Sequence, residues 1–283
     1  MQKLKSILLI GQSNMAGRGF LHDVSPIYNE NIVMLRNGRW QMMAEPIHND
    51  REVAGVGPGA SFAAAWSQDH PGEKIGLIPC AEGGSSIDEW APDQMILRHA
   101  ISEARFALET SELIGVLWHQ GESDSLDGRY VEYAQKLQTV FSYIREQLGV
   151  PNVPIIVGQL PDFLGKSGFG LSATEFTEIN REMAKVVAAD EQAYLVSAEN
   201  LASNPDGIHI NAESQRRFGL RYYEAYAKQK DVLHALDNEE EKLSSIYARP
   251  ATKNEKIYLL SRDFAFGKMD YQQFIEEITK ITQ

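Results

Sequence analysis

The feature that most constrains the fold is a set of five short apolar segments, at residues 6–10, 74–79, 114–119, 154–160 and 193–197. None of them alternates between apolar and polar residues, as a strand with one face in water does. Strands that are apolar on both faces are typical of a parallel sheet that helices cover on both sides. We therefore predict a sheet of five buried parallel strands.

The segments between these strands have the residue spacing of amphipathic helices. Apolar residues recur three and four positions apart between residues 130 and 148, and a stripe of this kind faces a hydrophobic core. Residues 96–108 and 174–189 behave similarly, and Asn211 is suited to cap a helix over residues 211–228. Strands that alternate with helices indicate an open α/β sheet, in which ligands bind beyond the carboxyl ends of the strands.

Charge and length restrict the partners of the chain. Its 283 residues carry a formal net charge of -12, which disfavours non-specific binding to nucleic acid and to anionic lipid. No stretch approaches the roughly 18–20 apolar residues of a membrane span, and the run at residues 7–10 is shorter than the roughly 7–15 residues of a signal-peptide core. We expect a cytoplasmic protein without nucleic-acid or membrane partners. Cys80 is the single cysteine, which excludes an intrachain disulfide.

A serine flanked by glycines follows the first predicted strand. The sequence Gly-Gln-Ser-Asn-Met-Ala-Gly at residues 11–17 places Ser13 at the carboxyl end of that strand. The glycines permit close backbone approach, so the hydroxyl can project into the crevice. The same serine is equally suited to a simple helix cap. The segment has neither the phosphate-loop pattern nor the Gly-x-Ser-x-Gly elbow of the α/β-hydrolases, so it is a candidate nucleophile of another kind.

A candidate base for this serine lies beyond the last predicted strand. In Asp-Gly-Ile-His at residues 206–209, Asp206 precedes His209 by three positions. A nucleophilic serine needs a base, and the base needs an acceptor that orients it. One loop supplies both here, although the same residues also fit a turn beside an exposed histidine. His119, at the end of the third predicted strand, is the alternative base.

Two further segments with small or amide-bearing residues lie at the ends of the second and third predicted strands, at residues 80–87 and 118–124. Acyl transfer needs donors aimed at a developing oxyanion, and a glycine N–H or a glutamine amide is suitable. Glu122 and Asp124 alternatively suggest a metal site. Two acids without histidine or cysteine at ligand spacing are weak evidence for one, and we predict no metal.

Together these motifs resemble the SGNH hydrolases, specifically the branch of sialate O-acetylesterases and acetylxylan esterases (carbohydrate esterase family 6). The resemblance covers about residues 1–229, with its segments in family order. They are Gly-Gln-Ser-Asn-Met-Ala-Gly at 11–17, Gly-Pro-Gly at 57–59 with Phe62-Ala63, Gly-Gly-Ser at 83–85, Trp-His-Gln-Gly-Glu-Ser-Asp at 118–124 and Asp-Gly-Ile-His at 206–209.

The resemblance implies a fold and a division of the chain. The implied fold is a three-layer α/β/α, flavodoxin-like SGNH-hydrolase fold with a five-stranded parallel sheet, over an esterase domain at residues 1–229. Residues 230–283 lie outside the resemblance. There, apolar spacing at 257–264 and 271–281 predicts two helices. We expect a C-terminal helical extension that carries no catalytic group.

The resemblance also implies the roles of individual residues, and no cofactor. Ser13 is the implied nucleophile, His209 its base, and Asp206 the partner of the histidine. The implied oxyanion donors are the N–H groups of Ser13 and Gly84 and the side chain of Gln120, with Gly83 as the alternative to Gly84. SGNH enzymes in general have asparagine where this chain has Gln120.

These residues predict an O-acetylesterase that acts on an acetylated sugar or oligosaccharide, of the acetylxylan or sialic acid type, through an acetyl-enzyme. One alternative is a general short-chain esterase or thioesterase with the same site. Another is a carbohydrate-binding protein without activity, against which the full set of catalytic residue types argues. The sequence is also compatible with a homo-oligomer.

Overall fold

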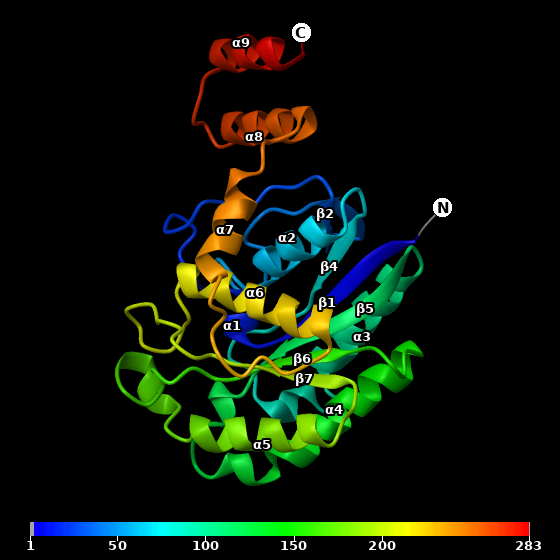
Figure 1. The fold of residues 1–283 in the computed structure, drawn as a ribbon, viewed down its shortest axis with the longest axis vertical. Coiled ribbons are helices and arrows are strands. Elements are labelled where there is room, and N and C mark those ends of the chain that lie inside the picture. Colours follow the sequence, from blue (N-terminus) through cyan, green and yellow to red (C-terminus); the bar gives the residue numbers. More distant parts are fainter. Residues whose placement is uncertain (1–2, 283) are drawn as a thin grey trace.

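The computed structural model describes residues 3–282, and a seven-stranded sheet forms its centre (Figure 1). Across the sheet the strand order is β3-β2-β4-β1-β5-β6-β7, and all neighbours pair in parallel except β2 and β3. The five predicted strands are β4, β1, β5, β6 and β7, in the flavodoxin-like order 2-1-3-4-5. The strand bounds are β1 (Leu4–Gly11), β2 (Ile32–Arg36), β3 (Arg39–Met42), β4 (Ile75–Pro79), β5 (Ser111–His119), β6 (Ile155–Gly158) and β7 (Ala193–Val196).

The prediction of five strands was wrong, because β2 and β3 extend the sheet beyond β4. They form an antiparallel hairpin around Asn37 and Gly38, whose φ angles are 51° and 72°. An Asn-Gly pair with positive φ angles is a common two-residue hairpin turn. The edge strand β3 has alternately exposed and half-buried residues. It therefore lacks the continuous apolar run by which the buried strands were recognised.

Helices cover both faces of the sheet, as the amphipathic patterns predicted. One hydrophobic core joins the sheet to α2 (Gly59–Asp69) and α6 (Ala212–Lys228), and a second joins it to α3 (Met95–Leu108), α4 (Tyr133–Leu148) and α5 (Phe176–Ala188). Adjacent residues of β1 divide between the two cores, since Ile7 and Leu9 belong to the first and Leu8 and Ile10 to the second. Short 3-10 helices lie at Ile87–Trp90, Glu122–Asp124, Arg129–Glu132 and Gly168–Ser172.

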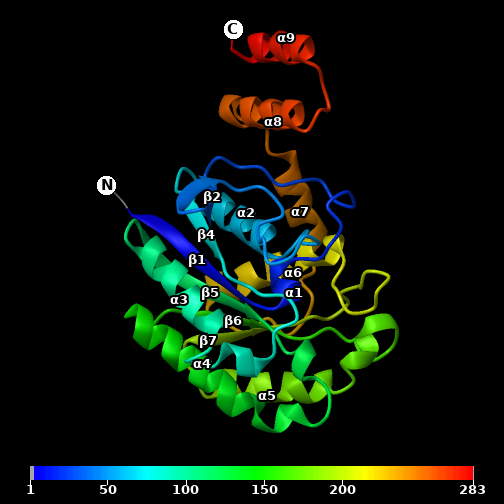
Figure 2. The same ribbon diagram turned by 180° about the vertical axis from the view of Figure 1, so that it is seen from behind.

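The C-terminal residues form three helices. α7 (Glu239–Ala248) packs against α6 and α2, and the buried ion pair of Arg221 with Glu239 joins it to the main body. α8 (Lys253–Ala265) and α9 (Tyr271–Thr282) correspond to the two predicted helices. They stand beyond the main body as a helical hairpin (Figures 1 and 2). Within residues 3–282, no helix has the length and apolarity needed to cross a membrane.

The carboxyl ends of β1 and β5 are held unusually close together. A Cβ atom on Gly11 would lie 2.0 Å from the carbonyl oxygen of His119, so no larger residue fits at this position. The Gln12 N–H donates to the same oxygen at 2.8 Å. Directly afterwards the chain turns into the short helix α1 (Ser13–Ala16). Ser13 therefore lies at the carboxyl edge of the sheet, where α/β proteins bind their ligands.

Candidate active site

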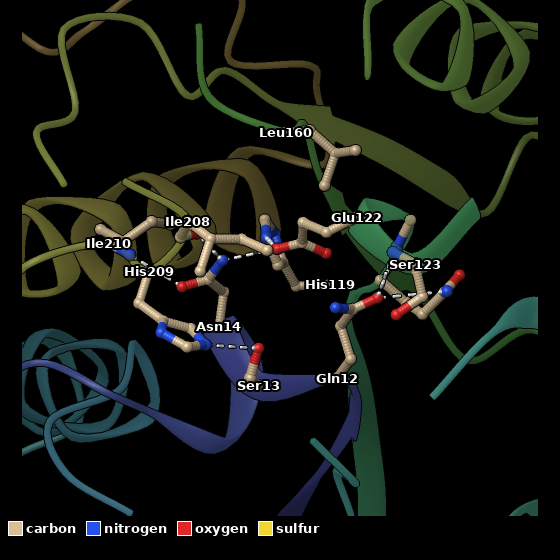
Figure 3. Close-up of polar contacts among 12 residues, drawn as sticks. Gln12, Ser13, Asn14, His119, Glu122, Ser123, Leu160, Ile208, His209 and Ile210 are labelled. Carbon is tan, nitrogen blue, oxygen red and sulfur yellow. Dashed lines mark hydrogen bonds and ion pairs between the residues drawn. The ribbon is translucent and has the colours of Figure 1, made fainter. Parts of the chain in front are cut away.

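The side chain of His209 joins Ser13 to Asp206, although the two lie far apart in the sequence. Ser13 Oγ lies 3.1 Å from His209 Nε2 (Figure 3). On the other side of the ring, Asp206 Oδ2 lies 2.7 Å from His209 Nδ1. Ser13 comes from the end of β1, and the other two residues come from the loop before α6. This is the geometry of a nucleophile, its base and the acceptor that orients the base.

The other oxygen of Asp206 fixes the loop itself. Asp206 Oδ1 accepts the N–H groups of Ile208 and His209, both at 3.0 Å. Burial alone would raise the pKa of Asp206, but the hydrogen bonds from His209 and Ile208 outweigh it, and the pKa lies below its ordinary 3.8. Asp206 is therefore a carboxylate at neutral pH, which favours the Nδ1–H tautomer of His209 and leaves Nε2 as an acceptor for the serine proton.

His119, the alternative base, faces a different partner. It is fully buried, and its Nε2 lies 3.2 Å from Glu122 Oε1. Burial favours the neutral form of Glu122, but the charge of His119 and hydrogen bonds from His119 and Asn14 outweigh it and lower the pKa of Glu122. Figure 3 shows the His119 ring beside Asn14 and Glu122, whereas the His209 ring faces Ser13. This arrangement makes His119 the partner of a buried carboxylate.

Asn14 connects this buried pair to the loop that carries His209. Its Nδ2 donates to Glu122 Oε1 at 2.5 Å and to the Ile208 carbonyl at 3.2 Å. Its Oδ1 accepts the Ile210 N–H at 2.8 Å. The backbone on both sides of His209 is thus bonded to the residue that follows Ser13, which keeps the imidazole and the hydroxyl in register.

The side-chain amide of Gln120 donates its hydrogen bonds to protein groups and not toward Ser13. The side chain is fully buried, and its Nε2 donates to Ser85 O at 3.0 Å and to Asp124 Oδ2 at 2.5 Å. Tyr133 donates to its Oε1 at 3.0 Å. Our expectation of an oxyanion donor at this position does not agree with the structure, because both hydrogens of this amide already have acceptors in the protein.

Gln12 is a functional candidate that the sequence reasoning missed. Its Oε1 accepts the N–H groups of Gly121 at 3.2 Å and Ser123 at 3.4 Å. These donors fix the amide oxygen, so the amide nitrogen points the other way, toward the side of Ser13 (Figure 3). The sequence feature that could have identified Gln12 is its position next to Ser13 in the glycine-flanked motif. The polar segment at residues 120–124 thus orients a donor instead of supplying one.

The geometry also distinguishes between the two candidate glycines. The Gly83 N–H donates to Asp50 Oδ2 at 2.9 Å. A Cβ atom on Gly83 would lie 2.4 Å from Arg18, whereas one on Gly84 would meet nothing within 4 Å. Among residues 3–282, no acceptor bonds the Gly84 N–H. Gly84 is thus the glycine whose N–H is available to a ligand, and its role as an oxyanion donor stays a prediction.

Two cavities are lined by residues of this site. One has a volume of about 540 Å³ and is lined by Asp206 and His209 together with Arg18, Phe20 and further residues of the 18–22 and 53–55 segments. The other, of about 680 Å³, is lined by residues 79–85, Gly84 among them, and by residues from 48–51 and α3. Both volumes lie within the roughly 300–1,000 Å³ that is usual for small-molecule sites.

Known structures share this fold. A protein of Arabidopsis thaliana described as a "Probable carbohydrate esterase" is 30% identical over 241 residues, which cover 77% of this chain and 88% of the relative. Its X-ray structure superposes with a TM-score of 0.71 at 28% identity, over 80% of this chain and 98% of that one. The structure of NanS has a TM-score of 0.65 at 15% identity, over 81% and 98% of the two chains. A carbohydrate acetylesterase from Xanthomonas citri has a TM-score of 0.52 at 17% identity, over 79% of this chain and 56% of that one.

A family model agrees with these likenesses and extends over most of the chain. The model described as "carbohydrate esterase, sialic acid-specific acetylesterase" matches residues 3–228. That range contains all seven strands, Ser13 and the Asp206–His209 pair. It agrees with the predicted limit of the resemblance and leaves α7, α8 and α9 outside the match. The chain belongs to this family of carbohydrate esterases.

Proposed function

We propose that this protein is a serine ester hydrolase that removes O-acetyl groups from acetylated carbohydrate through an acetyl-enzyme. The observation that carries the proposal is the chain of hydrogen bonds from Ser13 Oγ to His209, at 3.1 Å, and from His209 to Asp206, at 2.7 Å. Membership of a carbohydrate esterase family supports both the reaction and the substrate class.

In the proposed reaction His209 acts first as a base and then as an acid. Its Nε2 takes the proton of Ser13 as Oγ attacks the acetyl carbonyl, and it then returns that proton to the sugar oxygen as the C–O bond breaks. The same nitrogen activates a water molecule, which attacks the acetyl-enzyme and releases acetate. Asp206 stabilises the imidazolium that forms in both steps.

The negative oxygen of each tetrahedral intermediate needs fixed donors. We assign this role to the N–H groups of Ser13 and Gly84 and to Gln12 Nε2, in place of the amide of Gln120. Donors held rigidly by the protein stabilise the oxyanion more than they stabilise the neutral ester, which lowers the barrier. The bonds from Gly121 and Ser123 to Gln12 Oε1 supply that rigidity.

The charges around the site favour an uncharged sugar over sialic acid. Arg18, in the cavity beside His209, pairs with Asp50 at 2.6 Å, and both side chains are almost fully buried. Arg51, in the cavity beside Gly84, pairs with Glu82. Among the described residues that line these cavities, each arginine thus has an acidic partner. A substrate carboxylate would find no unpaired cation, so we propose a neutral acetylated glycan.

A panel of acetyl esters tests this function. We expect acetate release from a chromogenic acetate and from acetylated xylo-oligosaccharides, and slower release from O-acetylated sialic acid, compared by kcat/KM. A preference for the sialic acid ester would contradict the neutral-sugar assignment but leave the esterase intact. The absence of acetate release from every ester would refute the proposed reaction.

The size of the acyl group provides a further prediction. A site shaped for one methyl group rejects longer chains by overpacking, which typically costs about 1–3 kcal/mol. We therefore expect acetyl esters to exceed butyryl esters in kcat/KM by about tenfold to a hundredfold, measured with esters of one alcohol. The wall beside His209 includes the exposed side chains of Phe20, Leu21 and Val53. A preference for octanoyl esters would favour the general esterase or lipase alternative.

Substitutions of Gln12 separate the two candidate amide donors. Gln12→Glu keeps an oxygen that can accept the Gly121 and Ser123 N–H groups but removes the NH₂ group. We expect kcat to fall by at least roughly 10²–10³, the usual cost of losing one oxyanion donor, with a smaller change in KM. Steady-state kinetics on the folded variant measures this, and a near-normal kcat would exclude Gln12 from the oxyanion hole.

Gln120→Ala is the matched variant, and a different result is expected from it. Loss of the Gln120 amide leaves the buried Asp124 and the Ser85 carbonyl without this donor, which costs about 1–3 kcal/mol for each unsatisfied group. We therefore expect the main effect on the free energy of unfolding, measured by urea denaturation. A loss of kcat as large as that of Gln12→Glu, in a stable protein, would restore Gln120 as the donor.

A further inference from the structure

The cavity beside His209 adjoins a second cavity at the C-terminal helices. The second cavity has a volume of about 600 Å³ and lies between the segment around Tyr28 and the residues Arg262, Asp263 and Lys268 of α8 and the turn after it. Leu21 and His22 line both cavities. A ligand that occupies the candidate active site can therefore continue past His22 toward α8.

Several interactions hold α8 in place at the edge of this second cavity. Glu255 is fully buried and accepts the Glu30 N–H at 2.8 Å. The same carboxylate pairs with Arg249 at 2.7 Å. Arg262 donates to the hydroxyl of Tyr28, and its guanidinium lies over the Tyr28 ring at 5.6 Å from the centroid. The hairpin of α8 and α9 extends beyond the main body in Figures 1 and 2, but its first helix is bonded to Glu30 and to Tyr28, which lines the second cavity.

The walls of this path combine ring faces with polar groups. Phe20, which is 44% exposed, stacks against His22 with ring centroids 5.8 Å apart and an interplanar angle of 5°. Farther along lie the ring of Tyr28 and the charged ends of Arg262 and Lys268. A sugar ring presents apolar C–H faces and a rim of hydroxyl groups, so it can pack on the rings while it bonds to the polar ends.

Most of the charges in the second cavity are paired, and Arg262 is the exception. Lys268 pairs with Asp263 at 2.9 Å, and the Glu45 carboxylate binds both terminal nitrogens of Arg216. Arg262 is bonded to the neutral hydroxyl of Tyr28. Paired charges still offer hydrogen bonds to hydroxyl groups but attract a charged ligand only weakly. The paired charges of the second cavity suit a neutral glycan, and Arg262 adds the one cation among its described lining residues that has no carboxylate partner.

We propose that the second cavity is a distal subsite that binds a neutral glycan chain whose acetylated residue lies at Ser13. This inference rests on the proposed esterase function and adds to it the length of the substrate. The distal wall comes from α8 and the turn after it, which lie outside the residues 3–228 that match the family. The substrate is accordingly an acetylated oligosaccharide or polysaccharide, and the C-terminal extension contributes to its recognition.

The test compares substrates of different length in variants of the full chain. The substrates are a chromogenic acetate, an acetylated xylobiose and an acetylated xylohexaose. The variants are Arg262→Ala and Lys268→Ala, with Lys256→Ala as the control, because Lys256 is an exposed cation of α8 that does not line the cavity. Thermal unfolding of each variant shows whether the hairpin remains in place.

For the unaltered protein we expect kcat/KM to be about tenfold higher for the hexaose than for the biose, since one or two added hydrogen bonds are worth about that factor. Arg262→Ala and Lys268→Ala should each lower kcat/KM for the hexaose by a factor of about three to ten. The loss should appear as a higher KM with an unchanged kcat, because the contacts are remote from the reacting atoms. Hydrolysis of the chromogenic acetate should not change, and Lys256→Ala should match the unaltered protein on all three substrates.

Two results would overturn the distal subsite while the proposed function stands. One is hydrolysis of both saccharides with equal kcat/KM, and the other is an equal loss on short and long substrates in Arg262→Ala and Lys268→Ala. Failure of the proposed function has a different signature. Hydrolysis of the chromogenic acetate alone would remove carbohydrate as the substrate, and inactivity on all three esters would remove the esterase.

Discussion

Replacement of Ser13 by alanine is expected to lower kcat by a factor on the order of 10⁴ or more, because in the proposed reaction the Ser13 hydroxyl forms the acetyl-enzyme. The hydroxyl of Ser13 has its side-chain hydrogen bond with His209, so little stability depends on it. The measurement is the rate of acetate release under saturating substrate, with circular dichroism to compare the folds of the two proteins.

Covalent labelling provides an independent check on the nucleophile. A serine-directed organophosphorus reagent should modify Ser13 in the unaltered protein and leave the Ser13→Ala variant unmodified. Ser85 and Ser123 are the informative alternatives, because both are close to the candidate site and donate to backbone carbonyls, of Glu82 and Gly84 respectively. Modification at either of these serines would contradict the assignment.

Asp206→Asn is expected to lower kcat by about 10⁴, the scale that the loss of this acceptor has in other serine hydrolases. The reason lies in the hydrogen bonds of the loop. Asp206 Oδ1 accepts two N–H groups, from Ile208 and His209, so the amide oxygen of asparagine should keep that place. Its NH₂ group would then face His209 Nδ1 and favour the tautomer with the proton on Nε2. Such an imidazole cannot accept the proton of Ser13.

Kinetics over a range of pH values, together with two companion variants, test this explanation. His209→Ala should abolish turnover as completely as Ser13→Ala, since nucleophile and base act as one unit. Asp93→Asn is a matched control, because Asp93 is exposed and distant in sequence from the 206–209 loop, and it should retain the activity of the unaltered protein. If Asp206→Asn retained more than about a tenth of that activity, the proposed role of Asp206 would be wrong.

The sequence by itself determined the core of the sheet and the choice of candidate catalytic residues. The five buried strands could be predicted because each is apolar on both faces, a property that is local and independent of neighbours. Ser13, Asp206 and His209 could be selected because their motifs follow predicted strands or share one short loop. The helices α8 and α9 were likewise predicted from local apolar spacing.

Other parts of the fold depended on contacts that no local pattern records. Strand β3 is a half-exposed edge, so its side chains carry no continuous apolar signal, and only its pairing with β2 defines it. α7 begins within an acidic run that resembles a solvated loop. It is stabilised by packing on α2 and α6 and by the ion pair of Glu239 with Arg221. Because these two residues are distant in the sequence, the spacing of apolar residues does not reveal their contact.

The tertiary structure alone decided the direction of each amide and the position of the cavities. Gln12 and Gln120 are the same residue type, and both belong to motifs of the site. Their roles differ because Gly121 and Ser123 bind the oxygen of Gln12, while Asp124 and Ser85 accept from the nitrogen of Gln120. The adjoining cavity arises in the same way, where α8 packs on the segment around Tyr28. Hydrogen-bond partners and cavity walls are properties of residues brought together by folding, so they cannot be read from either segment separately.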